Sequence, residues 1–106
     1  QRDVRQSLPR ARPAADVAFR REVQRIAEAQ AALEDGNPAA ARRALEAHER
    51  LFARGRLVHA REVLMVQLLV AEGRPREAKK QAQQFLNADP SSTLRGALEA
   101  VVGKLD

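Results

Sequence analysis

The chain has 106 residues, of which 44% are hydrophobic and 31% charged, and its net charge is +5 at pH 7. This balance excludes a disordered chain, and the length suits one domain with one modest core. Cysteine is absent, which excludes disulfides, thiolate metal sites and thiol catalysis. The three aromatic residues are all phenylalanine, so Leu, Val, Ile and Ala must build the core.

Residues 1–14 carry most of the excess positive charge. They contain four arginines and one aspartate, which leaves a net charge of +2 for the other 92 residues. Pro9 and Pro13 interrupt any helix there, so we expect a solvated linker or, alternatively, a basic arm that binds an anionic partner. The folded domain is expected over residues 15–106. Because the first residue is Gln1, we expect the chain to be a fragment or a processed product of a longer protein.

Two amphipathic helices are predicted next. The first runs from Asp16 as N-cap to Glu34, and its expected buried stripe is Phe19, Val23, Ile26, Gln30 and Leu33. The second follows Asn37 as its cap, starts at Pro38 and ends near Gly55. Its apolar stripe comprises Ala41, Ala44, Leu45, His48, Leu51 and Phe52.

Residues 57–71 form the most apolar stretch, in which only Gln67 is polar between Val63 and Val70. A helix that is apolar nearly all round must be covered by neighbours on several sides. A buried strand is the alternative for a short apolar run, but the flanking helix formers favour a central helix.

Two further helices complete the predicted all-α fold of about five helices. One starts at Pro75 and has a thin stripe of Ala78, Ala82, Phe85 and Leu86. After a break at residues 87–92, a helix capped by Ser91 or Ser92 follows. Its single apolar stripe suits a C-terminal capping helix and comprises Leu94, Leu98, Val101, Val102 and Leu105.

An internal repeat with a spacing of 37 residues relates the first two helix pairs. The paired positions are Ile26 and Val63, Gln30 and Gln67, Leu33 and Val70, Gly36 and Gly73, Pro38 and Pro75, Ala41 and Ala78, and Leu45 and Ala82. A repeated hairpin of this size cannot bury its own faces and must stack on the next one.

Ala29, Gly36, Ala41 and Leu45, and in the second copy Gly73, Ala78 and Pro90, give the chain a pattern that resembles the tetratricopeptide repeat family over residues 20–90. The family's Trp and Tyr positions are occupied by Arg25, Ala32, Glu62 and Leu69. The resemblance implies two stacked helical hairpins in a right-handed α-solenoid, and a protein-binding groove formed by the first helix of each pair.

Several fragments also resemble C-terminal helical domains of cell-envelope proteins and anti-sigma-type regulators of high-GC Gram-negative bacteria. They are residues 44–48, 51–57, 60–62 and 73–78, with Phe85-Leu86 and Pro90-Ser91-Ser92. The high ratio of Arg to Lys likewise indicates a GC-rich bacterial gene. This resemblance implies a scaffold or regulator in the periplasm or cell envelope.

No pattern of catalytic residues is found. His48 is not followed by a second histidine four residues later, so the zinc-protease helix motif is absent, and His59 is expected to be exposed. Neither histidine has an obvious Asp or Cys partner. Phosphate loops, nucleophile elbows and calcium loops are also missing. We therefore expect no enzyme, no metal and no cofactor.

The expected function is binding of a partner peptide or helix in a groove, where Gln30 and Gln67 bond the partner's backbone. The predicted groove residues are Val23, Ile26, Gln30, Leu33, Glu34, Val63, Gln67 and Val70. Alternatively, the C-terminal helix fills this groove and the two glutamines bond neighbouring helices.

Two other functions are kept open. One is self-association through the ends of a short array, which would make a homo-oligomer. The other is nucleic-acid binding, disfavoured by the lack of stacking aromatics, at a basic edge of Arg54, Arg56, Arg61, Arg74, Arg76, Lys79 and Lys80. No apolar run has the length needed for direct membrane insertion.

Overall fold

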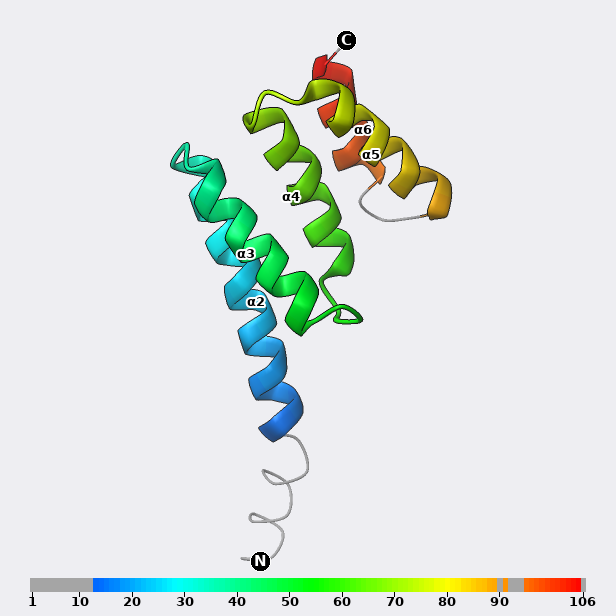
Figure 1. The fold of residues 1–106 in the computed structure, drawn as a ribbon. Coiled ribbons are helices and arrows are strands. Elements are labelled where there is room, and N and C mark those ends of the chain that lie inside the picture. Colours follow the sequence, from blue (N-terminus) through cyan, green and yellow to red (C-terminus); the bar gives the residue numbers. More distant parts are fainter. Residues whose placement is uncertain (1–12, 90, 92–94, 106) are drawn as a thin grey trace, which may run out of the picture.

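The computed structural model describes residues 13–89, 91 and 95–105, and the described chain is entirely helical apart from turns (Figure 1). Its five helices are α2 (Pro13–Glu34), α3 (Pro38–Leu51), α4 (Val58–Ala71), α5 (Pro75–Ala88) and α6 (Arg95–Leu105). The predicted all-α fold of about five helices is confirmed.

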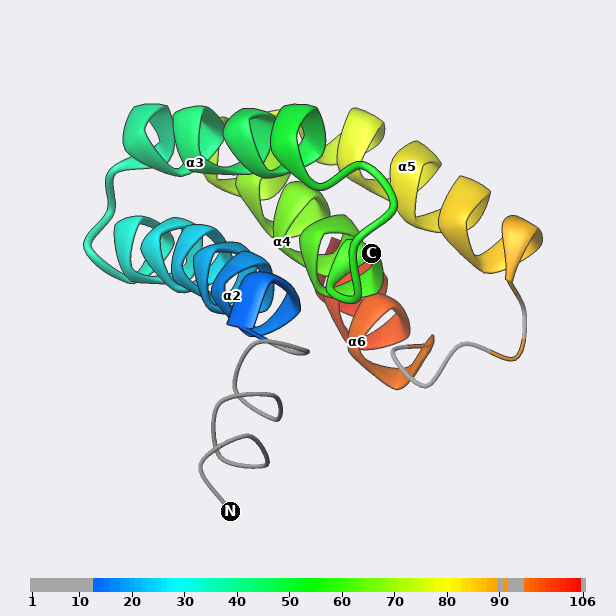
Figure 2. The ribbon, with the colours of Figure 1, turned by 90° about the horizontal axis from the view of Figure 1, so that it is seen from below.

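The helices lie in two layers (Figure 2). One layer contains α2, α4 and α6 and the other contains α3 and α5. Each helix contacts the next one along the chain, and α4 also contacts α2 and α6 within its own layer. The apolar central helix α4 is therefore covered by four neighbours, as its composition predicts.

The turns α2–α3 and α4–α5 are copies of each other. In both, a glycine with positive φ ends the helix, Gly36 at 72° and Gly73 at 76°, where a Cβ would be strained. The backbone hydrogen bonds also repeat at an interval of 37 residues: Gly36 to Leu33 and Gly73 to Val70, and Asn37 to Ala32 and Arg74 to Leu69. The repeat found in the sequence is therefore present in the backbone.

Helix α6 stands in the same relation to α4 as α4 does to α2. It begins 37 residues after α4, at Arg95 against Val58. The α6 side chains that contact the second helix pair occupy the same repeat positions as the α4 side chains that contact the first. The matching positions are Leu98 and Arg61, Val101 and Leu64, and Val102 and Met65. Helix α6 thus covers the second helix pair in the way that α4 covers the first.

The core has two clusters, one for each helix pair, that meet in α4. The first cluster comprises Ala29, Ala41, Ala44, Leu45, Leu64 and Leu68. The second comprises Val63, Val66, Leu69, Ala78, Ala82 and Leu98. Opposite faces of α4 belong to different clusters, and small alanines on α2, α3 and α5 allow the helices to pack closely.

The predicted stripe of the first helix is wrong at two positions. Val23 is 42% exposed and Gln30 is also exposed, whereas Glu22 and Ala29 are buried. Both α3 and α4 contact α2, and they cover the face that follows Glu22, Ile26, Ala29 and Leu33. Because Val23 is apolar, the predicted stripe was placed one residue away from the face that is buried in the structure.

Other element boundaries also differ from the sequence prediction. Helix α2 begins at Pro13 rather than Asp16, because proline is tolerated in a first helical turn. Helix α3 ends at Leu51, and Leu51, which was expected in the buried stripe, is 57% exposed because no described helix covers that side. Of the predicted linker at residues 1–14, residues 13 and 14 belong to α2 instead, and residues 1–12 lie outside the described part of the chain. The predicted residues Pro90, Ser92 and Leu94 also lie outside it.

Candidate functional site

The eight predicted groove residues are divided between surface and core. Ile26 and Leu33 are half-buried against the first cluster, and Val63 is buried in the second. The other five are exposed along α2 and α4, namely Val23, Gln30, Glu34, Gln67 and Val70. Gln30 and Gln67 thus present their amides to solvent at equivalent positions of two adjacent helices. They do not bond neighbouring helices within the described chain.

The predicted basic edge is split into two groups. Arg54, Arg56 and Arg61 lie before or near the start of α4, and the remaining four lie beyond its end or on α5. A helix of 14 residues is about 21 Å long, so the two groups stand at opposite ends of α4. Several members already have partners: Arg56 lies over the Phe19 ring, with its guanidinium carbon 5.0 Å from the centroid, and Arg74 bonds Glu77.

The most concentrated polar site in the described structure is a buried carboxylate that the sequence analysis missed. Glu22 is 3% exposed, and its Oε2 lies 2.9 Å from Nε2 of the fully buried His48. The same Oε2 accepts a hydrogen bond from the Leu57 backbone N–H at 2.7 Å, and Oε1 accepts one from Arg56 N–H at 3.1 Å. One side chain of α2 thus holds both α3 and the chain that enters α4.

The hydrogen bonds keep the Glu22 carboxylate ionised. Burial alone raises the pKa of Glu22, but the backbone N–H groups of Leu57 and Arg56 and the His48 ring donate to the charged form. These bonds outweigh the burial and leave the pKa of Glu22 below its ordinary value. The buried charge is therefore compensated by three hydrogen-bond donors.

The partners of His48 define its tautomer. Arg61 Nη1 lies 3.2 Å from His48 Nδ1, and a guanidinium can only donate, so Nδ1 must accept. The ring proton is then on Nε2, where it is donated to Glu22. A carboxylate, an imidazole and a guanidinium that are hydrogen-bonded in a row resemble an acid–base relay. The His48 ring, however, has no exposed surface, and both its nitrogens are hydrogen-bonded to protein groups. A substrate cannot reach His48 in this structure.

Gly55 makes the close approach of Glu22 possible. A Cβ placed on Gly55 would lie 2.2 Å from Glu22 Oε2, which is far inside van der Waals contact. The glycine lies in the turn between α3 and α4, and its N–H bonds the Phe52 carbonyl at 2.9 Å. Gly55 is thus required by its neighbour rather than by its own backbone conformation.

An ion pair fixes the opposite end of α4. Arg42 of α3 donates to both oxygens of Glu72, from Nε at 2.8 Å and from Nη2 at 2.7 Å. The hydrogen bond from Arg42 lowers the pKa of Glu72, and the same bond raises the pKa of Arg42. Such bidentate pairs hold geometry more firmly than single surface contacts. Helix α4 is therefore tied to the first helix pair near both of its ends.

His59 is exposed, as predicted, but it does have carboxylate neighbours. Its Nδ1 lies 2.9 Å from Glu62 Oε1 and its Nε2 lies 3.5 Å from Asp89 Oδ2.

Across the described residues, no group of three or more His, Cys, Asp or Glu is arranged to hold a metal ion. None of the described helices is long and apolar enough to cross a bilayer.

A pattern for the buried carboxylate was present in the sequence. Glu22, Ile26, Ala29 and Leu33 follow the same helical spacing as the stripe that was chosen, but with a charged residue at one end. The alternative stripe with Val23 and Gln30 is more apolar, so hydrophobicity alone selects it. The stripe with Glu22 is favourable because His48 and the backbone N–H groups of Arg56 and Leu57 bond its carboxylate, which a sequence does not display.

Comparison of the chain with protein-family models, with curated proteins and with solved structures finds no significant match.

Replacing Gly55 with Ala should lower the free energy of unfolding by about 1–3 kcal/mol, because the new Cβ displaces a buried carboxylate from its donors. Chemical denaturation measures this loss. Gly96→Ala in α6 is the matched control, because a Cβ there meets nothing within 4 Å and alanine favours a helix. Equal stability of the two variants would contradict the role assigned to Gly55.

Stability should also depend on pH through Glu22. A glutamate whose folded pKa is lowered adds stability above its unfolded pKa of about 4.3, and this stability is lost as pH falls through the folded value. Glu22→Gln should therefore be less stable than the parent at pH 7, and the gap should shrink below about pH 4. Denaturation curves between pH 7 and pH 2.5 test this, with the exposed Glu28→Gln as control. A gap that stays constant would mean that Glu22 is not the titrating group.

Proposed function

We propose that this domain is a non-catalytic module that binds another protein and serves as a scaffold, and that its helix pairs stack as in tetratricopeptide arrays. The repeated turns and the stepwise packing of α2, α4 and α6 support the proposed stacking. The absence of a substrate path to His48 supports a non-catalytic role.

The observation that carries the proposal is the open face of α2 and α4. Gln30 and Gln67 occur there at the same position of the repeat, and both are exposed. Val23 and Val70 are exposed beside them at 42% and 38%. Two amides that can bond a backbone, together with apolar side chains that gain from burial, are what a bound peptide or helix requires.

A partner helix or strand that crosses both α2 and α4 would meet Gln30 and Gln67 in turn. The helices contact each other directly, so a single segment of the partner can reach both amides. Neither glutamine has a role in the core. Their contribution to binding is therefore separable from their contribution to folding.

The double variant Gln30→Ala and Gln67→Ala should lose partner binding without losing stability. Each lost hydrogen bond weakens binding by about 1 kcal/mol, which together gives a loss of roughly tenfold or more. Exposed side chains change the unfolding free energy by only about 0.5 kcal/mol. The measurement is quantitative capture of proteins from the native host's lysate, together with thermal melting of both forms.

Gln84→Ala on α5 is the matched control, since Gln84 is exposed on the other layer. Equal capture by the double variant and the parent would remove this face as the binding site. Recovery of only the domain itself would instead favour self-association. A large fall in melting temperature would show that the glutamines stabilise the fold.

A further inference from the structure

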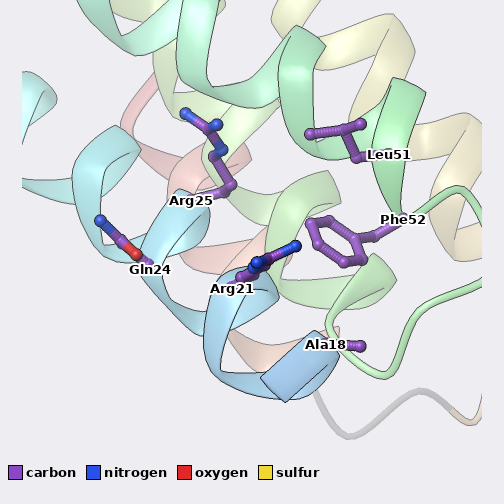
Figure 3. Close-up of a pocket in the computed structure, with 6 residues that line it drawn as sticks. All are labelled: Ala18, Arg21, Gln24, Arg25, Leu51 and Phe52. Atoms are coloured by element: carbon purple, nitrogen blue, oxygen red, sulfur yellow. The ribbon is translucent and has the colours of Figure 1, made fainter. Parts of the chain in front are cut away.

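A second feature of the first helix pair has the form of a ligand site. A hollow of about 500 Å³ lies between the first half of α2 and the end of α3. It is lined by Ala18, Arg21, Gln24, Arg25, Leu51 and Phe52 (Figure 3). The volume is sufficient for one or two side chains of a bound peptide. This hollow does not include Gln30 or Gln67.

The side of the hollow formed by α3 is apolar and firmly held. Leu51 is 57% exposed, more than Val17, Val23 or Val70. Phe52 is half-buried, and its ring packs against the buried His48 ring with centroids 5.7 Å apart. Phe52 is therefore a fixed wall, and Leu51 is an apolar side chain that gains stability if a partner covers it.

The side formed by α2 carries uncommitted positive charge. Arg21 is exposed, makes no hydrogen bond or ion pair with another described residue, and extends toward Phe52 in Figure 3. Arg25 bonds only Glu28 within the described chain, at 3.4 Å, and both side chains are more than 40% exposed. Surface pairs of this kind contribute little and are readily exchanged.

The surroundings of the hollow are also basic. Arg20 precedes Arg21, Arg50 precedes Leu51 and Arg54 follows Phe52 by two residues; these three are exposed and bond no other described residue. Within residues 16–28 and 49–54, the exposed carboxylates are Asp16, Glu28 and Glu49. They are fewer than the arginines of the same two segments, which are Arg20, Arg21, Arg25, Arg50 and Arg54. An occupant with negative charge is therefore favoured.

We propose that this hollow binds an acidic segment of a protein partner that also carries a large apolar side chain. The apolar side chain packs between Leu51 and Phe52, and a carboxylate accepts two hydrogen bonds from Arg21. Arg25 exchanges Glu28 for a second carboxylate of the partner. This inference rests on the proposed function as a protein-binding module and gives the chemistry of one partner segment.

A peptide fits these features better than the other anionic macromolecules. A nucleic acid would leave Leu51 uncovered and would find one aromatic ring, Phe52, for stacking. A bilayer surface favours side chains that project outward, whereas here the apolar groups line a hollow. Both remain as outcomes of the test.

The test is selection of random 12-residue peptides displayed on phage against the immobilised domain, followed by anisotropy titrations of the enriched peptides. We expect the enriched peptides to combine Asp or Glu with Leu, Ile, Phe or Met. Arg21→Glu and Leu51→Ser should each weaken their binding at least tenfold. Both residues are exposed, so both variants should melt as the parent does.

Arg76→Glu is the control for charge reversal, because Arg76 is exposed on α5 of the second helix pair. Enrichment of no peptide, enrichment of basic or uncharged peptides, or equal binding by Arg21→Glu would overturn the proposal. Binding of phosphatidylglycerol vesicles or a single-stranded 20-mer that both Arg21→Glu and Leu51→Ser abolish would also overturn it. If peptide binding depends on Gln30 and Gln67 instead, the hollow is excluded as the binding site, whereas the proposed protein-binding function is supported.

Discussion

The Glu22 carboxylate makes the contacts on which the arrangement of α2, α3 and α4 depends. It lies inside the structure and joins α2 to the His48 ring of α3 and to the backbone N–H groups that precede α4. A buried carboxylate is tolerated only when donors replace its lost hydration. Three donors do so here, and one further contact, from Arg61 to His48, brings α4 into the same network. Every buried side-chain nitrogen and oxygen of the described residues has a partner.

The two helix pairs share their turns but differ at the junction to the next helix. At an interval of 37 residues, Glu22 corresponds to His59, which is exposed, and His48 corresponds to Phe85, which packs against the second core cluster. Within the second helix pair, α5 is therefore held mainly by apolar packing against α4 and α6. Polar contacts fix α4 at both ends, so the stable unit that presents the α2 and α4 face is the first pair together with α4. Both proposed binding surfaces lie on this unit.

The regular features of the fold were accessible from the sequence, because they depend on local signals. Gly36 and Gly73 end helices where a positive φ is needed, and proline begins the next helix in both repeats. The site was not accessible in the same way. Hydrophobicity placed Val23 rather than Glu22 in the core. The structure reverses this because the donors to Glu22, the His48 ring and two backbone N–H groups, are 26 to 35 residues away in the sequence. The exposure of Leu51 likewise depends on packing, because none of the described helices covers that side of α3.

The protonation of the His48 ring is the sharpest test of the hydrogen-bond network around Glu22. A long-range proton–nitrogen correlation spectrum of the ¹⁵N-labelled domain at pH 7 distinguishes the two neutral tautomers and the charged ring. We expect His48 to carry its proton on Nε2 and Nδ1 to be an unprotonated acceptor. The Nε2 proton should exchange slowly because the ring is buried. A proton on Nδ1, or a ring with protons on both nitrogens, would contradict the hydrogen bonds assigned to Glu22 and Arg61.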